Sequence, residues 1–313
     1  MNLIDLFDNC QYKGVSQETE IVPRAGKVMP MNNAPQIALA AWLALSVVVA
    51  ASEPATDKPA TVAPKILPVP GETFVVKGSQ AFIMLPAENL RRKPQPWIWY
   101  APTLPGYPDE HEKWMHERFV AAGIAVAGID VGESYGSPAG RSRFTDLYNE
   151  LTEKRGFAAR PCLLGRSRGG LMVTSWAVNH ADVVAGIAGI YPVLDFRTYP
   201  GLDKAAPAYG MSVNELGERL AEFNPIERVA SLAKARVPVF IIHGDIDTVV
   251  PLKENSAELL RSYKAEGAEA SVKLVVAEKQ GHNFWEGFFR CQELVDFAIE
   301  RAREGAKATQ VKP

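Results

Sequence analysis

The chain has 313 residues, of which 47% are hydrophobic and 22% are charged, a balance typical of one large globular core or two small domains. The formal net charge of -2 implies no strongly basic face, which argues against a nucleic-acid partner. Three cysteines, Cys10, Cys162 and Cys291, are too few and too scattered for a disulfide framework or a zinc site. Cys162 is expected in the core, and a single disulfide between Cys162 and Cys291 stays open.

An apolar run without a single charge occupies residues 34–51. Its core has the length of the hydrophobic region of a signal peptide, and Ala50 and Ala51 offer a cleavage site. The whole run is also close to the lower length limit of a membrane-spanning helix. We therefore expect a leader at residues 1–51, which either directs secretion or periplasmic export by cleavage or stays as a membrane anchor.

Two alternatives stay open for this segment. Translation starting at Met29 or Met31 would make the first residues an artefact, and the apolar run could instead be a buried helix of the core. Residues 52–70 are rich in Pro, Ala and Thr and show no apolar period, which is typical of an extended linker. This linker separates the run from the rest of the chain and favours export.

From residue 71 to about residue 306, strand-like and helix-like segments alternate. Strands are expected at 71–78, 80–86, 96–102, 124–130, 161–165, 183–195, 237–244 and 271–278, and helices at 108–123, 168–180, 253–267 and 288–304. Apolar strands separated by amphipathic helices indicate an α/β domain, in which helices cover both faces of a mostly parallel sheet. A helix-rich insertion at about 196–235 is expected to form a small lid, and residues 307–313 a tail.

The strand expected at 161–165 leads into the sequence Gly-Arg-Ser-Arg-Gly at residues 165–169, and a helix follows. This is a G-x-S-x-G nucleophile elbow in the strand–turn–helix context that the motif requires. The turn is expected to leave no room for a Cβ at either glycine. It raises Ser167 above the carboxyl ends of the strands, near a helix N-terminus that favours an anion. A glycine-rich turn with an idle serine is the alternative, but the context favours a nucleophile.

A serine hydroxyl needs a base to take its proton, and the base needs an acid to orient it. In folds with a nucleophile elbow of this kind, the three follow one another along the chain as serine, acid and histidine. His111 and His116 lie on a predicted helix before the elbow and are expected to face solvent. His180 lies near the end of the helix after the elbow, and His243 ends a strand as a structural residue. Only His282, in the sequence GHNF after the last strand, follows the serine and every plausible acid loop.

For the acid, the strand expected at 237–244 opens into the loop DIDTVVP, where Asp245 and Asp247 compete. The pattern HG-x-x-D-x-x-VP places Asp247 at the turn, and we choose it as the acid. Asp245 is expected to hold the loop backbone by side-chain hydrogen bonds. Asp195, at the end of the preceding strand, is a third choice.

The elbow GRSRG, the loop HGDIDTVVP and the closing GHNF resemble the α/β-hydrolase superfamily, nearest to its prolyl-oligopeptidase-like and dienelactone-hydrolase-like serine esterases. The resemblance covers about residues 71–304. It implies the α/β-hydrolase fold and a Ser-His-Asp triad of Ser167, His282 and Asp247. The three motifs in this order are specific for the superfamily but not for a substrate.

The resemblance also implies an oxyanion hole made of two backbone N–H donors. The first is the N–H of Arg168, the residue after the nucleophile. Many members supply the second from an HG or HGG sequence after the third strand, but here Pro102 has no N–H to donate. Ala101 or Thr103 must replace it, and we choose Ala101.

The side chain of Arg168 has two expected roles. Ser followed by Arg is similar to the elbow of glucuronoyl esterases, where the arginine helps to hold the oxyanion, and it could also bind an acidic substrate group. Alternatively, both elbow arginines form ion pairs with acidic residues such as Asp130 or Glu133. Arg168, Trp285 and Tyr199 are our candidates for contacts with the substrate.

These patterns predict a serine hydrolase that cleaves small or carbohydrate-linked carboxylic esters through an acyl-enzyme, with no metal or other cofactor. A prolyl-oligopeptidase-like serine peptidase is the alternative. Only about seventy residues precede the predicted core, whereas such peptidases usually carry a large propeller domain. A catalytically inactive hydrolase fold used for binding is a third possibility, although all three triad residues are present.

Overall fold

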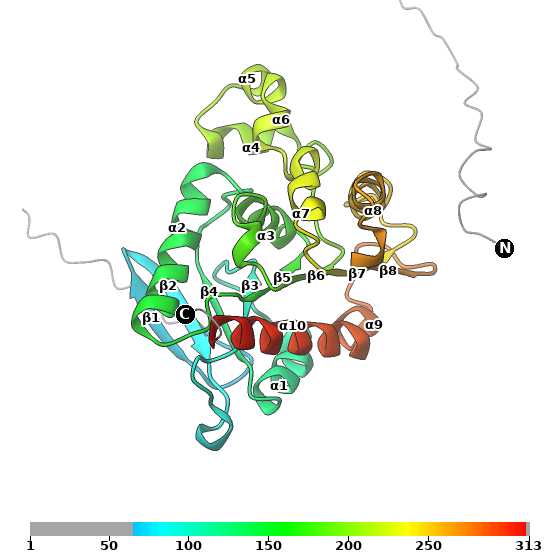
Figure 1. The fold of residues 1–313 in the computed structure, drawn as a ribbon. Helices are drawn as coiled ribbons and strands as arrows, with labels where there is room; N and C mark the ends of the chain where they lie inside the picture. The colour runs from blue at the N-terminus through cyan, green and yellow to red at the C-terminus, as the bar shows by residue number, and fades with distance from the viewer. Residues whose placement is uncertain (1–64, 311–313) are drawn as a thin grey trace, which may run out of the picture. The chain divides into compact units, whose positions relative to one another are not determined.

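The computed structural model describes residues 65–310, which are built around one eight-stranded sheet (Figure 1). The strands are β1 (Glu72–Val76), β2 (Ser79–Met84), β3 (Trp97–Ala101), β4 (Ala125–Ile129), β5 (Cys162–Arg166), β6 (Gly186–Ile190), β7 (Val239–Gly244) and β8 (Val272–Ala277). Their order in the sheet is β1-β2-β4-β3-β5-β6-β7-β8. Strand β2 is antiparallel to both of its neighbours, and all other pairs are parallel. This confirms the predicted fold class.

Helices cover both faces of the sheet, as predicted. They are α1 (Lys113–Ala121), α2 (Pro138–Asn149), α3 (Gly169–Ala177), α4 (Leu202–Tyr209), α5 (Val213–Glu218), α6 (Leu220–Phe223), α7 (Ala230–Lys234), α8 (Ser256–Ala265), α9 (Glu286–Phe289) and α10 (Gln292–Gln310). Single turns are η2 (Glu88–Leu90), η3 (Glu110–Glu112), η4 (Glu150–Lys154), η5 (Ala181–Val183), η6 (Pro225–Arg228) and η7 (Glu269–Ser271). Helices α1 and α10 lie on one face, and α2, α3 and α8 on the other (Figure 1).

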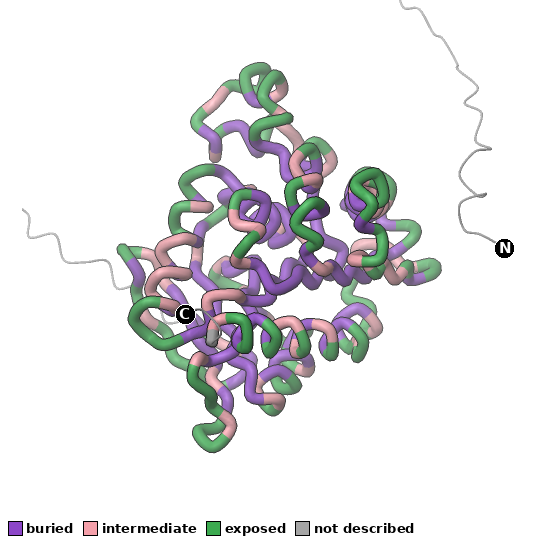
Figure 2. The backbone as a smooth tube through the Cα atoms, viewed as in Figure 1, coloured by how far each residue is buried: buried purple, intermediate pink, exposed green. Residues whose placement is uncertain are grey.

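Strand β3 shows why a continuous apolar strand fits between two helical layers. Successive side chains of a strand point to opposite faces, so Trp97 and Trp99 enter one core while Ile98 and Tyr100 enter the other. Every residue of β3 to β7 is buried, whereas the edge strands β1 and β8 are partly exposed (Figure 2). The carboxyl ends of the buried strands therefore carry the loops that reach solvent.

The predicted insertion at 196–235 contains helices α4 to α7 between β6 and β7. It has a small core of its own, which includes Phe196, Tyr209 and Phe223 and also takes in Leu171 of α3 and Val250 of the loop after β7. The insertion is thereby packed against two of the segments that carry the predicted triad.

Other boundaries differ from the sequence expectations. The predicted leader at 1–51 and most of the predicted linker at 52–70 lie outside the described residues. Helix α2 with η4 was not predicted, and α10 continues to Gln310, into the stretch expected as a tail. No helix within residues 65–310 is long and apolar enough to cross a membrane. Cys162 is buried in β5 as expected, and both Cys162 and Cys291 are free thiols, not a disulfide.

Candidate active site

The nucleophile elbow is formed between β5 and α3. Ser167 stands there with a φ of 49°, in the left-handed region that residues with a side chain rarely adopt. A Cβ on Gly169 would lie 2.1 Å from the carbonyl oxygen of Ala101, and one on Gly165 would lie 2.9 Å from a methyl of Val173. These distances show the steric reason for both glycines that the motif predicted.

The three predicted triad side chains lie in one hydrogen-bonded line. The Oγ of Ser167 is 2.8 Å from Nε2 of His282, and Nδ1 of His282 is 2.8 Å from Oδ2 of Asp247. The carboxylate accepts from Nδ1–H, which leaves Nε2 free to accept the serine proton. The elbow, the loop after β8 and the loop after β7 each contribute one member, so residues 35 and 115 positions apart in the chain meet.

Asp247 also organises its own loop. Its second oxygen, Oδ1, accepts hydrogen bonds from the backbone N–H groups of Val249 at 2.9 Å and Val250 at 2.8 Å. Asp245, which we expected to hold the loop, is exposed, and its side chain makes no hydrogen bond within residues 65–310, so that expectation was wrong. The carboxylate of Asp247 therefore holds both the imidazole of His282 and the turn on which Asp247 itself lies.

A second histidine supports Asp247 from behind, in agreement with its predicted structural role. His243 is fully buried, with Nδ1 2.7 Å from the hydroxyl of Ser256 and Nε2 2.8 Å from the carbonyl oxygen of Val250. Its Nε2 is also 3.4 Å from Oδ2 of Asp247. Burial alone would raise the pKa of Asp247, but hydrogen bonds from His243, His282 and Val250 lower this pKa well below its usual value.

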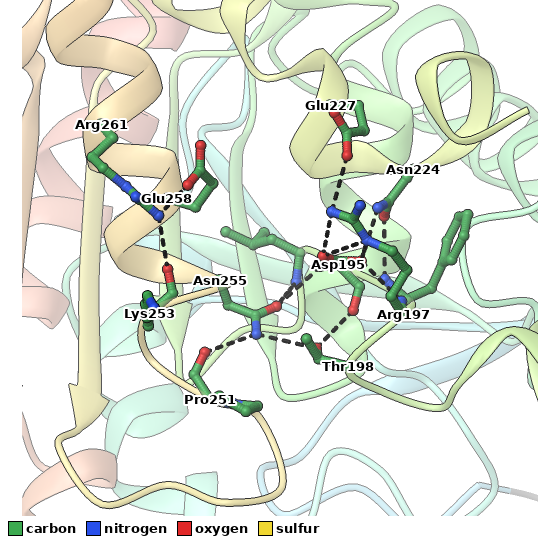
Figure 3. Close-up of polar contacts among 12 residues, drawn as sticks. Asp195, Arg197, Thr198, Asn224, Glu227, Pro251, Lys253, Asn255, Glu258 and Arg261 are labelled. Atoms are coloured by element: carbon green, nitrogen blue, oxygen red, sulfur yellow. Dashed lines mark hydrogen bonds and ion pairs between the residues drawn. The ribbon is translucent and has the colours of Figure 1, made fainter. Parts of the chain in front are cut away.

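A buried amide joins this acid loop to the segment after β6 (Figure 3). The Oδ1 of Asn255 accepts from the N–H groups of Leu194 at 2.8 Å and Asp195 at 3.0 Å. Its Nδ2 donates to the hydroxyl of Thr198 at 3.2 Å and to the carbonyl of Pro251 at 2.9 Å. All four hydrogen-bonding positions of the amide are filled, which fixes the two segments relative to each other.

Asp195, the third choice for the acid, serves this junction and makes no contact with His282. Its carboxylate accepts from Arg197 at 2.7 Å and from the amide of Asn224 at 2.8 Å. Arg197 also pairs with Glu227 at 2.9 Å, so the group ties the start of the insertion to its later turn (Figure 3).

A cavity of about 150 Å³ adjoins Ser167 and His282. Its lining is Pro102, Tyr107, Arg166, Ser167, Arg168, Tyr191, His282, Asn283 and Phe284. Among the predicted substrate contacts, Arg168 lines this cavity, and its guanidinium lies 5.7 Å from the centre of the Tyr199 ring. Trp285 does not line the cavity. It is 44% exposed and packs on Phe288.

The two elbow arginines point to different acidic partners. Arg168 forms an ion pair with Glu133, as the second of its two expected roles required. Arg166 is buried and pairs instead with Asp109 and Glu112, each at 3.0 Å. The pairing of Arg166 was missed because both partners lie in a distant segment, around η3.

The two residues predicted as oxyanion donors lie on segments next to the elbow. Arg168 is the N-cap of α3, where backbone N–H groups lack partners within the helix. Ala101 ends β3 with its carbonyl against Gly169, but the residue that reaches the cavity from this segment is Pro102. The part of Ala101 as second donor stays a prediction. Thr103 is buried, and its hydroxyl donates to the carbonyl of Ile129.

A buried lysine holds the loop that supplies Pro102 and Tyr107. The ammonium of Lys65 donates to the carbonyls of Leu104 at 2.7 Å and Tyr107 at 2.8 Å and contacts that of Thr103 at 3.4 Å. It also pairs with Asp130 at 3.0 Å. Asp130 is thus the ion-pair partner of Lys65, not of an elbow arginine. The ammonium of Lys65 binds the carbonyls of the loop that forms this part of the cavity wall.

One histidine expectation was wrong. His116 is fully buried on the inner side of α1 between Tyr100 and Phe119, not exposed to solvent. Neither ring nitrogen has a hydrogen-bond partner within the described residues, and burial lowers the pKa of His116 to about 3. His111 is exposed as expected, and its ring stacks on Phe284 with 4.2 Å between centroids.

Comparison with known proteins supports this description. The model of the prolyl oligopeptidase family matches residues 144–298. A puromycin-hydrolyzing peptidase of Mycobacterium tuberculosis is similar with a TM-score of 0.58 and 14% identity, over 74% of this chain and 40% of that one. Est1E from Butyrivibrio proteoclasticus is similar with a TM-score of 0.54 and 18% identity, over 74% of this chain and 99% of that one. MPT51 of Mycobacterium tuberculosis is similar with a TM-score of 0.59 and 14% identity, over 75% of this chain and 100% of that one. No curated protein matches the chain.

At these identities the solved structures show the fold, and the chain spans less than half of the mycobacterial peptidase. The family match covers the elbow, the loop after β7 and the loop after β8 in one continuous stretch. The resemblance expected from the motifs is therefore confirmed: the chain has the α/β-hydrolase fold, and its residues 144–298 match the prolyl oligopeptidase family.

Proposed function

We propose that this chain hydrolyses carboxylic esters with Ser167 as nucleophile, His282 as base and Asp247 as orienting acid. The observation that carries the proposal is the hydrogen-bonded line from Ser167 to His282 to Asp247, which ends at an open cavity. The same geometry is what general-base activation of a serine requires, because each proton acceptor is already within reach of its donor.

The reaction proceeds in two acyl transfers. The Oγ of Ser167 attacks the ester carbonyl while Nε2 of His282 takes its proton, and the developing oxyanion is met by the N–H of Arg168 and by a second donor, for which we propose Ala101. The imidazolium then gives its proton to the leaving alcohol, and an acyl-serine remains. Water repeats the sequence, which releases the acid and restores the serine.

We propose carbohydrate-linked esters as the natural substrates and a site of action outside the cytoplasm, either secreted or periplasmic, with membrane anchoring as the alternative. The leader predicted at residues 1–51 supports the location, and fractionation of cells expressing the full chain tests it.

A peptidase is the second candidate, because peptidases are among the similar structures.

A fluorophosphonate probe and 4-nitrophenyl acetate test the proposal together. The parent protein should be labelled and should hydrolyse the ester, and Ser167→Ala should lose the label and nearly all turnover. Ser262→Ala on α8 is the matched control and should retain both. A folded parent protein that is neither labelled nor active would support the binding-protein alternative instead. Aminoacyl 4-nitroanilides offered beside the acetate ester separate a peptidase from an esterase.

A further inference from the structure

A second and larger hollow adjoins the nucleophile cavity. It has a volume of about 380 Å³ and lies between helices α1 and α9. Phe284 lines both this groove and the cavity that contains Ser167 and His282. The two hollows therefore share the wall that Phe284 forms.

The walls of the groove include several aromatic rings. His111 stacks on Phe284 at 4.2 Å between centroids with an interplanar angle of 20°, and Phe289 lies beside His111 at 5.6 Å. Trp114 of α1 is partly exposed and lines the groove as well. Phe284 is 56% exposed, which is high for a phenylalanine in a folded domain.

Charged groups of both signs alternate with these rings. Glu286 pairs with Arg290 at 2.8 Å, and Glu110 lies 3.7 Å from Lys113. Glu117 is exposed and forms no ion pair or side-chain hydrogen bond within residues 65–310. The groove thus offers both hydrogen-bond acceptors and hydrogen-bond donors beside flat apolar surfaces.

We propose that this groove binds the sugar part of a carbohydrate-linked ester, an inference that rests on the esterase function proposed above. A sugar ring has C–H faces that fit aromatic rings and hydroxyl edges that both donate and accept hydrogen bonds. An alkyl chain in the same place would desolvate the charged groups without giving them partners. An extended peptide that binds by strand addition needs an open strand edge, whereas this groove is walled by side chains from η3, α1, α9 and the segments beside them.

Trp114→Ala and Glu117→Gln test the inference, with Glu88→Gln on η2 as the matched control for the exposed glutamate. The readout is kcat/KM for an O-acetylated disaccharide divided by kcat/KM for 4-nitrophenyl acetate. This ratio should fall about two- to tenfold in both groove variants, mainly through KM, since one aromatic contact contributes to that extent. Glu88→Gln should keep the parent ratio. Because Glu117 is exposed, its variant reports on binding even where Trp114→Ala is less stable.

The outcomes separate the two proposals. A parent protein inactive on 4-nitrophenyl acetate would defeat the esterase proposal itself. Activity on that ester with none on the acetylated disaccharide, or an unchanged ratio in both groove variants, would overturn the sugar site alone. A loss confined to Trp285→Ala, a residue outside the groove lining, would place the sugar elsewhere and would also overturn it. If the parent protein preferred 4-nitrophenyl octanoate to 4-nitrophenyl acetate and Trp114→Ala abolished this preference, the groove would be an alkyl site instead.

Discussion

At the scale of single residues, Asp247 combines two tasks that many sites divide between residues. One oxygen orients His282, and the other accepts two backbone N–H groups of its own turn. The lowered pKa of Asp247 means that the carboxylate stays ionised in the fold down to very acidic pH. Any change at this position therefore disturbs both the tautomer of the imidazole and the loop that positions it.

Asp247→Asn should reduce kcat by about 10³–10⁴, because an amide facing Nδ1 stabilises the wrong imidazole tautomer. Asp245→Asn is the matched control, since Asp245 is exposed, and its kcat should stay within about twofold of the parent value. Steady-state kinetics on 4-nitrophenyl acetate measure both. A large loss in Asp245→Asn beside a small one in Asp247→Asn would mean that the acid has been assigned to the wrong aspartate.

His116 gives the fold a dependence on pH. Its pKa is lowered to about 3 by burial, so the folded state holds the neutral imidazole. The unfolded chain protonates this histidine near pH 6.5. Its contribution to stability is therefore complete above pH 6.5 and is lost as the pH falls toward 3.

Urea titrations at pH 6.5 and pH 5 should show that His116→Leu depends less on pH than the parent does. Over that interval the parent should lose up to about 2 kcal/mol through this group, at about 1.4 kcal/mol per pH unit. Asp247 does not interfere, because its contribution is lost only below the unfolded carboxyl pKa of about 3.9. The same pH slope in both proteins would contradict the neutral buried state of His116.

At the scale of elements, the loop between β3 and η3 is the part of the site with the most unusual support. It supplies Pro102 and Tyr107 to the cavity, and its carbonyls converge on the ammonium of Lys65. Burial lowers the pKa of Lys65 and raises that of Asp130, and their mutual attraction opposes both shifts. The ion pair with Asp130 thus keeps Lys65 in place, and Lys65 in turn holds the loop through its carbonyls.

Lys65→Met should lower the free energy of unfolding by about 2 kcal/mol, less than for a fully buried pair because Asp130 is partly exposed. It should also lower kcat/KM for 4-nitrophenyl acetate, since the cavity wall loses its anchor. The double variant Lys65→Met/Asp130→Asn removes the unpaired carboxylate and should recover stability but not activity. Recovery of both would show that the lysine acts on stability alone.

At the scale of the whole molecule, the local patterns were readable from the sequence, and so was the meeting of Ser167, His282 and Asp247, because each lies in a motif of the superfamily. The other distant contacts were not. A strand, a turn and a helix follow one another around Ser167, so the elbow could be predicted from a short stretch of sequence. The parallel sheet could be predicted in the same way, from short apolar strands that alternate with helices. Helix α2 was missed because few apolar residues mark its buried side, chiefly Phe144 and Leu147. Lys65 and Arg166 meet partners 39 and 57 positions away, and no local pattern indicates such pairs.

The junction at Asn255 shows how such contacts unite the molecule. Its amide links the turn after Asp247 to the segment that enters the insertion. Asn255→Leu keeps the volume but leaves the buried N–H groups of Leu194 and Asp195 without acceptors, which should cost about 2–4 kcal/mol of stability. Hydrogen exchange should rise together at residues 194–198 and 247–251, because one amide orders both. Thr198→Val, which removes a single bond to that amide, is the graded control. If exchange rose in the insertion alone and kcat did not change, the acid loop would be independent of this junction.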